Sequence, residues 1–244
     1  MYEGIYNMDL TSPRTIRNIQ EQFGFTFKKG LGQNFLTARN ILEEIVDAAE
    51  IESGVIEVGP GFGVLTSELA QNSDKVVTIE IDERLIDVLD YTLAEYDNVK
   101  IINEDILKLD LKKVIDDEFN GEKVSIAANL PYYITTPIIT KLLEEKLPIK
   151  NIVVMVQKEV AERMSAKPST KDYGAITVLC QYYTEPSIVA NVPASLFVPP
   201  PKVDSAVLKL KVLDKPSVEV KDEGVFFRVV KAAFSQRRKT LLNC

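Results

Sequence analysis

Residues 55–63 read VIEVGPGFG, a short apolar strand that ends in closely spaced glycines and leads into a helix-forming segment. Glycine lets the backbone turn tightly and lets a ligand approach the chain within contact distance. The spacing here is G-x-G-x-G, whereas dinucleotide-binding enzymes typically have G-x-G-x-x-G, so a pyrophosphate site is the poorer match. Gly59 and Gly61 are therefore candidate cofactor-binding residues, and the spacing alone leaves an ordinary tight turn open as the alternative.

On both sides of this turn, strand-like and helix-like patterns alternate along the chain. The apolar residues predict strands at 55–58, 75–81, 99–102, 124–128 and 152–157. They predict helices at 40–49, 64–70, 83–93 and 137–145, and a further helix from about Glu159. This order is typical of an α/β fold in which a mostly parallel, doubly wound sheet carries helices on both faces.

The N-terminal end of the chain departs from this alternation. Ser12-Pro13 is a typical helix start and predicts a helix over 15–23. We therefore expect residues 1–30 to form a short helical arm before the main domain, which would cover residues 31–213.

The C-terminal part changes rhythm after Lys171. β-rich patterns at 175–183, 186–191 and 205–212 predict that the sheet ends in antiparallel strands. Val198-Pro199-Pro200-Pro201 interrupts them as a stiff extended loop. A helical pattern starts at Glu223, so we expect residues 214–244 to begin a smaller helical domain.

The composition excludes several classes of protein. The chain has 244 residues, 45% of them hydrophobic, enough for one α/β core and a small appendage. It has no histidine and only two cysteines, Cys180 and Cys244, which argues against histidine catalysis, catalytic triads, a disulfide framework and a metal site. No apolar run approaches the roughly 18 residues of a membrane span, and the N-terminus lacks a secretion signal, so we expect a cytoplasmic protein with no membrane partner.

The net charge of −7 is unfavourable for nucleic-acid binding unless cations gather locally. Local clusters occur at Lys28-Lys29, at Lys158, Arg163, Lys167 and Lys171, and at Arg237-Arg238-Lys239. For each cluster alone, an ordinary solvated surface is the better explanation, so the three only support an RNA partner.

Acidic residues lie at the C-terminal end of the next predicted strand and just after the one that follows it. Glu80 comes about 20 residues after Gly59, the spacing at which an acidic residue meets a ribose diol in nucleotide-binding sheets. Its alternative role, a helix N-cap, can be filled by Asp82. Asp105 follows the third strand and could accept a hydrogen bond from the adenine amine of a cofactor. Because ligands bind at the carboxyl ends of strands in open α/β sheets, these residues should share one edge with Gly59.

The loop after the fourth strand reads ANLPYY at residues 128–133. The lone pair of an adenine amine is delocalised into the ring, so two acceptors are needed to direct it toward a methyl donor. The Asn129 side-chain oxygen and the backbone carbonyl of Leu130 or Pro131 could serve, and Tyr132 could stack on the target base. Such catalysis uses positioning and electrostatics and needs no histidine. An ordinary turn with a buried tyrosine is the alternative explanation of this loop.

These segments together resemble a known family, the bacterial small-subunit ribosomal RNA adenine dimethyltransferases of the KsgA type. The resemblance rests on residues 31–36 (LGQNFL), 57–61 (EVGPG), 80–82 (EID), 129–132 (NLPY), 197–205 (FVPPPKVDS) and 234–239 (FSQRRK). These segments occur in the same order as in the family and extend over nearly the whole chain.

The resemblance implies a Rossmann-like fold that binds S-adenosylmethionine, with a smaller helical C-terminal domain. It implies transfer of methyl groups to N6 of two adjacent adenosines near the 3′ end of 16S rRNA in the small (30S) subunit precursor, during ribosome biogenesis. It also assigns cofactor contacts to Asn34 and Leu36, a segment that the residues alone present as an ordinary loop. In the same way Gly59 would lie beside the methionine part of the cofactor, and Asn129 would serve both cofactor and target. Family members usually continue some tens of residues beyond 239, so the helical domain is expected to be incomplete here.

Three alternatives remain at this level. A large-subunit (23S) rRNA adenine methyltransferase of the macrolide-resistance type has the same fold, but its loop usually reads Asn-Ile-Pro-Tyr, whereas position 130 here is Leu. A non-catalytic ribosome-assembly factor could keep the fold, although the intact Asn129, Pro131 and Tyr132 favour an enzyme. An NAD-dependent oxidoreductase is the third alternative, and it would have to bind a nicotinamide.

Overall fold

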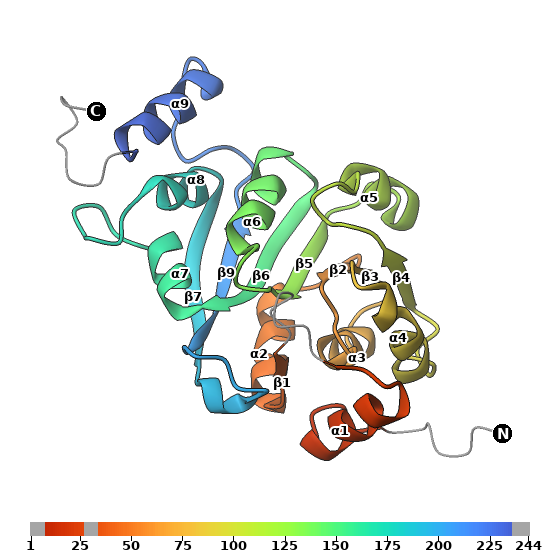
Figure 1. The fold of residues 1–244 in the computed structure, drawn as a ribbon. Coiled ribbons are helices and arrows are strands. Elements are labelled where there is room, and N and C mark those ends of the chain that lie inside the picture. The colour runs from red at the N-terminus through yellow and green to blue at the C-terminus, as the bar shows by residue number, and fades with distance from the viewer. Residues whose placement is uncertain (1–7, 27–33, 236–244) are drawn as a thin grey trace.

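The computed structural model of the chain describes residues 8–26 and 34–235, and within them a seven-stranded sheet forms the centre (Figure 1). Its strand order is β4-β3-β2-β5-β6-β9-β7, and the neighbours from β4 to β6 are parallel. β9 is antiparallel to both β6 and β7, which confirms the mostly parallel sheet with an antiparallel last strand. The predicted clusters at Lys28-Lys29 and Arg237–Lys239 lie outside the described residues, as does Gln33.

The strands of the structure have the following bounds: β1 Phe35–Leu36, β2 Val55–Val58, β3 Val76–Glu80, β4 Val99–Asn103, β5 Val124–Asn129, β6 Ile149–Gln157, β7 Thr184–Val192, β8 Phe197–Val198 and β9 Ser205–Val212. The helices are α1 Pro13–Gln22, α2 Arg39–Ala49, α3 Val64–Gln71, α4 Ile86–Thr92, α5 Leu111–Phe119, α6 Thr135–Glu144, α7 Lys158–Met164, α8 Ala175–Tyr183 and α9 Glu223–Ala233, with the short 3₁₀ helices η2 Glu83–Leu85 and η3 Ala194–Leu196.

The sheet is buried on both faces, which explains why its central strands are almost continuously apolar. In β6, for example, Ile152, Val154 and Val156 pack into the core cluster that contains α5, α6, α7 and α8. Val153 and Met155 point the other way, into the cluster that contains α1, α2, α3 and α4. Alternate residues of one strand therefore hold the two helical layers of Figure 1 against the same sheet.

The β structure expected at 175–183 is wrong, because this segment forms helix α8. Its β-branched and aromatic residues favour a strand locally, but the tertiary contacts favour a helix. The hydroxyl of Thr177 accepts from the backbone N–H of Gly174 (3.0 Å) and donates to the carbonyl of Arg163 (2.6 Å). Leu179, Cys180 and Tyr183 are buried on the sheet side.

Other differences from the sequence-based expectation are smaller. Helix α5 lies between β4 and β5, where the apolar pattern predicted no element. The helix expected over 83–93 is divided into η2 and α4. Ser12 does occupy the N-cap position of α1 and Pro13 its first turn, although the Ser12 side chain makes no capping hydrogen bond.

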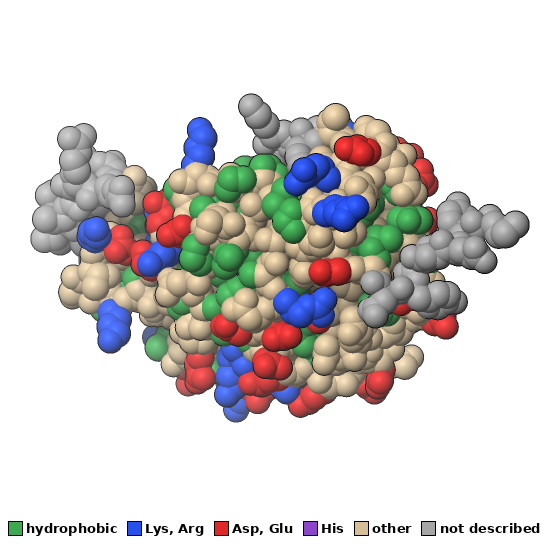
Figure 2. Space-filling model, turned by 90° about the horizontal axis from the view of Figure 1, so that it is seen from below, with side chains coloured by type: hydrophobic (Ala, Val, Ile, Leu, Met, Phe, Trp, Pro, Cys, Tyr) green, Lys and Arg blue, Asp and Glu red, His purple; other side chains and the backbone are tan. Residues whose placement is uncertain are grey.

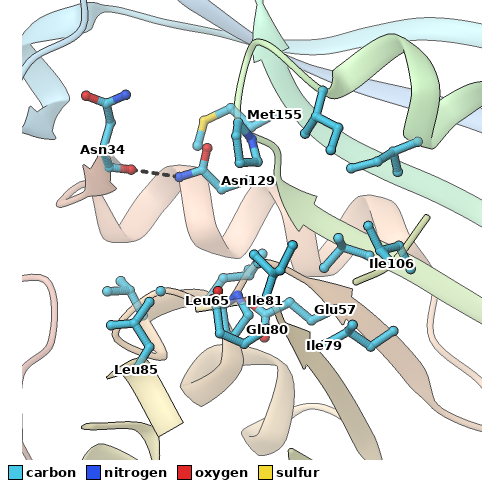
Figure 3. Close-up of a pocket in the computed structure, with 18 of the residues that line it drawn as sticks. Asn34, Glu57, Leu65, Ile79, Glu80, Ile81, Leu85, Ile106, Asn129 and Met155 are labelled. Atoms are coloured by element: carbon cyan, nitrogen blue, oxygen red, sulfur yellow. Dashed lines mark hydrogen bonds between the residues drawn. The ribbon is translucent and has the colours of Figure 1, made fainter. Parts of the chain in front are cut away.

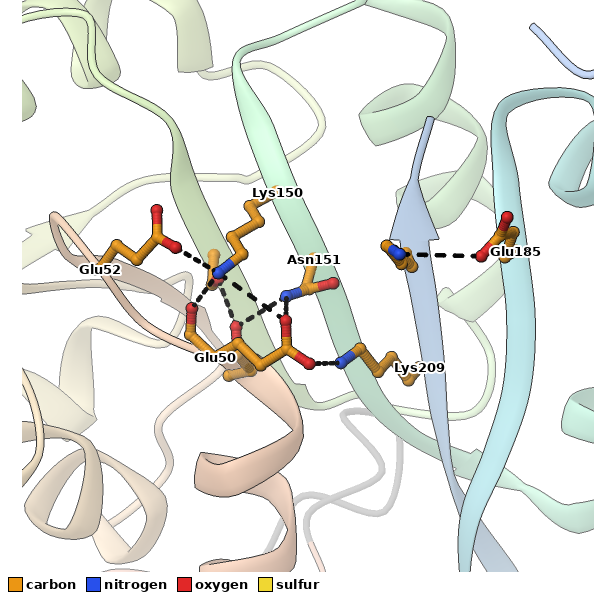
Figure 4. A network of polar contacts seen from close by, with 9 residues as sticks. Glu50, Glu52, Lys150, Asn151, Glu185 and Lys209 are labelled. Atoms are coloured by element: carbon orange, nitrogen blue, oxygen red, sulfur yellow. Dashed lines mark hydrogen bonds and ion pairs between the residues drawn. The ribbon is translucent and has the colours of Figure 1, made fainter. Parts of the chain in front are cut away.

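A polar network closes the end of the sheet where β5 and β6 begin (Figure 4). Asn151, fully buried in β6, donates its side-chain N–H to the carbonyl of Ala49 at the end of α2 (3.0 Å). Around it, Glu50 binds Lys209 of β9 (2.6 Å) and Lys150 binds Glu52 (2.6 Å). The amide is shielded from water, whereas the ion pairs are partly exposed, so the amide should contribute most of the stability.

We therefore predict that Asn151→Ala lowers the free energy of unfolding by about 1–3 kcal/mol, because a fully buried side chain is removed together with one of the two hydrogen bonds to the Ala49 carbonyl. Lys150→Ala, which removes only a partly exposed ion pair, should cost about 1 kcal/mol or less. Urea titration followed by circular dichroism measures both values, and a larger loss in Lys150→Ala than in Asn151→Ala would contradict this ranking.

Candidate active site

One pocket collects the carboxyl ends of the parallel strands. The glycine turn follows β2, Glu80 ends β3, Asp105 follows β4 and Asn129 ends β5. The residues lining this pocket include eight of those that the sequence marks as candidates: Asn34, Leu36, Gly59, Gly61, Glu80, Asp105, Asn129 and Pro131. Residues that lie 95 positions apart in the chain thus face a common space, as the sequence analysis requires.

The glycine turn leaves room for a ligand and for an aromatic ring. Gly59 and Gly61 have φ angles of 71° and 60°, which side chains other than glycine rarely adopt. A Cβ on Gly61 would lie 2.6 Å from the Phe35 ring, so only glycine lets β1 approach this closely. A Cβ on Gly59 would meet nothing within 4 Å and would project into open space. The turn therefore offers bare backbone to a bound molecule at Gly59.

Glu80 is a buried carboxyl group at the pocket wall, with 6% of its surface exposed. Burial raises its pKa to about 7, while hydrogen bonds from the N–H groups of Asp82 and Gly61 partly offset the shift. Asp82 itself caps η2, because its side chain accepts from the backbone N–H of Arg84. The capping role thus falls to Asp82, and the Glu80 carboxyl group lines the pocket.

Asp105 lies in the turn after β4, where its carboxylate accepts from the backbone N–H of Leu107 (3.0 Å). Ile81 and Ile106 also line the pocket, and Ile81 is 54% exposed. A flat apolar group beside Glu80 would therefore contact the aliphatic side chains of Ile81 and Ile106 (Figure 3). The sequence analysis did not single out these isoleucines, although each directly follows a predicted acidic site residue.

The Asn129 side chain is fixed in one orientation (Figure 3). Its Nδ2 donates to the backbone carbonyl of Asn34 (3.0 Å), and a carbonyl can only accept, so the amide nitrogen must face Asn34. The Oδ1 atom is consequently left for a donor in the pocket. The next residue continues the sheet, since the Leu130 N–H donates to the carbonyl of Met155 (3.1 Å).

The two backbone carbonyls of the loop differ in their hydrogen bonds. The Pro131 carbonyl accepts from the N–H of Ile134 (3.1 Å) and from the hydroxyl of Thr135 (3.2 Å), which uses both of its lone pairs. Within the described residues the Leu130 carbonyl accepts no such hydrogen bond. Leu130 is, however, only 1% exposed and does not line the pocket, whereas Pro131 does.

The two tyrosines of the loop have different environments. Tyr133 lines the pocket and is 58% exposed. Tyr132 is half-buried, does not line the pocket, and its hydroxyl forms a hydrogen bond with the Ser205 hydroxyl (2.7 Å). Tyr132, the residue predicted from the sequence to stack on the base, thus does not line the pocket, and its hydroxyl is occupied.

Glu57 was not predicted from the sequence, although a carboxyl group inside the apolar strand before the glycine turn is an unusual signal. It lines the pocket, is 1% exposed, and accepts a hydrogen bond from the Thr66 hydroxyl (2.6 Å). Burial raises its pKa to about 8, and the nearby Glu80 adds to this increase. Glu57 is therefore largely protonated in the folded protein at neutral pH.

Figure 2 shows the molecule from below the view of Figure 1. This is the face toward which strands β5 and β6 run. Apolar side chains gather in its middle, with lysine, arginine and acidic side chains around them.

No group of three or more potential metal ligands occurs in the described part of the chain. Nor does any helix of that part have the length and apolar character needed to cross a bilayer.

Known proteins with similar sequences indicate the same class of protein as the pocket does. The family model "Ribosomal RNA adenine dimethylase" matches residues 24–244. The ribosomal RNA small subunit methyltransferase A of Bacillus mycoides is 56% identical over 238 residues, which cover 96% of this chain and 82% of that protein. The protein of the same name from Bacillus anthracis matches to the same extent.

Solved structures also resemble this fold. A dimethyladenosine transferase from Plasmodium falciparum superposes with a TM-score of 0.68 and 34% sequence identity, covering 85% of this chain and 73% of that one. The 23S rRNA methyltransferase ErmE gives a TM-score of 0.67 and 32% identity, covering 82% of this chain and 79% of that one.

The sheet, the glycine turn and these similarities define a Rossmann-like, S-adenosylmethionine-dependent methyltransferase. The chain belongs to the ribosomal RNA adenine dimethylase family, and its reaction is the dimethylation of adenine in ribosomal RNA.

The protonated state of Glu57 predicts a pH dependence of stability. In the unfolded chain Glu57 loses its proton near pH 4.5, whereas the folded protein keeps it up to about pH 8. The folded state thus binds more protons in this interval, so its stability falls as the pH rises from about 4.5 to 8. Glutamine cannot titrate, so the Tm of Glu57→Gln minus that of the wild type should grow between pH 5 and pH 8 and then level off. Thermal unfolding at each pH measures this difference, and a constant difference would contradict the assignment.

Proposed function

We propose that this enzyme methylates N6 of two adjacent adenosines near the 3′ end of small-subunit (16S) rRNA, within the precursor of the 30S subunit. The small-subunit assignment is supported by the names of curated relatives that are 56% identical over most of the chain. The observation that carries the chemistry is the fixed Asn129 amide: its Nδ2 is bound to the Asn34 carbonyl, which leaves Oδ1 as the acceptor of a residue that lines the pocket together with Glu80 and Asp105.

The cofactor would lie along the strand ends. Bare backbone at Gly59 admits its methionine part, and Gly61, Asn34 and Leu36 line the same pocket. The Glu80 carboxylate accepts the two ribose hydroxyl hydrogens, and the Asp105 carboxylate accepts from the adenine amine. The bound cofactor supplies a methyl group activated on a sulfonium centre.

The target adenine would enter beside Asn129. Its amine has two hydrogens, of which Asn129 Oδ1 accepts one and a backbone carbonyl of the same loop, that of Leu130 or Pro131, accepts the other. These bonds hold the nitrogen lone pair toward the methyl donor and stabilise the positive charge that develops on nitrogen. Pro131 keeps the turn rigid and has no N–H that could compete for the acceptors. No side chain has to remove a proton before attack, and the surplus proton on the methylated nitrogen passes to water afterwards.

Aromatic stacking would hold the target base in place. Tyr132 is the proposed stacking residue, since its ring follows the acceptors in the same loop. The exposed ring of Tyr133 stands at the pocket mouth, where a flanking nucleotide of the RNA would pass.

Large-subunit rRNA is the second candidate substrate, because a 23S rRNA methyltransferase shares the fold at 32% identity. The two candidates are separated by incubating isolated, unmethylated small and large subunits with the protein and isotope-labelled S-adenosylmethionine. Mass spectrometry of the digested RNA should find labelled N6,N6-dimethyladenosine only in the small-subunit RNA. Label confined to the large-subunit RNA would overturn the small-subunit assignment.

We predict that Asn129→Ala lowers methyl transfer by about 10²-fold or more, because an acceptor preorganised for the transition state is lost. RNA binding, which depends on a wider surface, should remain largely intact in a filter-binding assay.

Asn98→Ala is a matched control for that variant. Asn98 also donates its amide to backbone carbonyls, those of Ala70 and Ser73 (both 2.8 Å), but it does not line the pocket. Its turnover should stay near the wild-type value. Full activity in Asn129→Ala would remove the basis of the proposed mechanism.

A further inference from the structure

The catalytic loop is tied to a distant strand by a hydrogen bond between two hydroxyl groups. The Tyr132 hydroxyl and the Ser205 Oγ are 2.7 Å apart, although the residues are separated by 73 positions in the sequence. Ser205 is fully buried and Tyr132 is half-buried, so water competes little for this bond. Burial raises the pKa of the Tyr132 hydroxyl, which therefore remains protonated at neutral pH.

Ser205 is a rigid anchor. It is the first residue of β9 and pairs with Gln157 of β6 on one side and with Val192 of β7 on the other. The preceding carbonyl, that of Asp204, accepts from the N–H of Lys158 (3.0 Å), which extends the β6 side of the ladder. A serine has one side-chain torsion, so its hydroxyl on this backbone has few positions available.

The strand register explains why the loop reaches Ser205. Asn129 lies opposite Met155 of β6, which lies opposite Val207 of β9. Ser205 is two residues beyond Val207, in the direction in which β5 and β6 run toward the pocket. The loop that begins at Asn129 therefore passes over the end of β6, and the Tyr132 hydroxyl meets β9 on the far side.

We propose that Ser205 is a positioning residue that holds the Tyr132 ring in the orientation needed to stack on the target adenine next to Asn129. This inference rests on the proposed function, because it assigns a task to the loop that the proposed function makes catalytic. Fixing the ring before the base arrives lowers the entropy that must be lost on the way to the transition state. The bond should therefore affect turnover on RNA while leaving the affinity for the cofactor unchanged.

A double-mutant cycle on the full chain tests this role. Turnover on unmethylated small-subunit RNA is measured at saturating S-adenosylmethionine for Ser205→Ala, Tyr132→Phe and the double variant. Each substitution removes the same hydrogen bond, so each single variant should lose about fivefold in kcat, the factor expected for one ordinary hydrogen bond. The double variant should lose the same factor and no more, and Ser205→Thr, which keeps the hydroxyl, should recover most of the activity.

Ser125→Ala serves as the matched control. Ser125 is also a buried sheet serine, 2% exposed, and its hydroxyl donates to the Ala49 carbonyl (2.6 Å) at the opposite end of the sheet. It should lower Tm without changing kcat. Tyr132→Phe removes the same hydrogen bond from the loop and leaves β9 unchanged. Its kcat therefore tests the positioning role even if Ser205→Ala folds poorly.

Unchanged kcat in Tyr132→Phe, or losses that multiply to about 25-fold in the double variant, would overturn the positioning role. Calorimetry with S-adenosylmethionine provides a second criterion, since a weaker cofactor affinity in Ser205→Ala would also contradict it. If the wild type methylates no adenine in small-subunit RNA, the proposed function itself fails. If the wild type is active but the effects of the two substitutions are additive, only the positioning role of Ser205 is rejected.

Discussion

The hydrogen bond from Asn129 Nδ2 to the Asn34 carbonyl determines what the pocket can do. An amide presents a donor on one side and an acceptor on the other, and only the nitrogen can face a carbonyl. The contact thus leaves the side-chain oxygen of Asn129 as the acceptor, the role in which the proposed mechanism uses it. It also joins the N-terminal segment to the central strand β5, so the geometry of one depends on the position of the other.

Three segments far apart in the chain meet around this contact. Phe35 and Leu36 of β1 pair with Val198 and Phe197 of β8, which places the residues before β9 beside the N-terminal segment. β9 in turn begins at Ser205, which binds the Tyr132 hydroxyl. The segments 34–36, 129–132 and 197–205 are therefore held together by backbone pairing and side-chain hydrogen bonds. Because each net hydrogen bond contributes only about 1 kcal/mol, the arrangement depends on several of them acting together.

The sequence predicted the residues whose chemistry is local and missed those that act through tertiary contacts. The glycine turn, Glu80 and the Asn129 loop each follow an apolar strand, so topology alone brings them to one edge. Asn34 contributes a backbone carbonyl to Asn129, and no side-chain pattern announces such a role; only the family resemblance indicated this segment. Glu57 could not be predicted from the sequence for a similar reason, because its raised pKa depends on complete burial in the folded protein.

A crystal structure of the chain with S-adenosylhomocysteine would show where the cofactor lies and how the Asn129 amide is oriented beside it. The account predicts that both ribose hydroxyls lie within hydrogen-bonding distance of the Glu80 carboxylate and that Asn129 keeps its Nδ2 on the Asn34 carbonyl, with Oδ1 facing the open mouth of the pocket. A cofactor bound away from Glu80, or an Asn129 amide whose nitrogen faces the mouth, would contradict it.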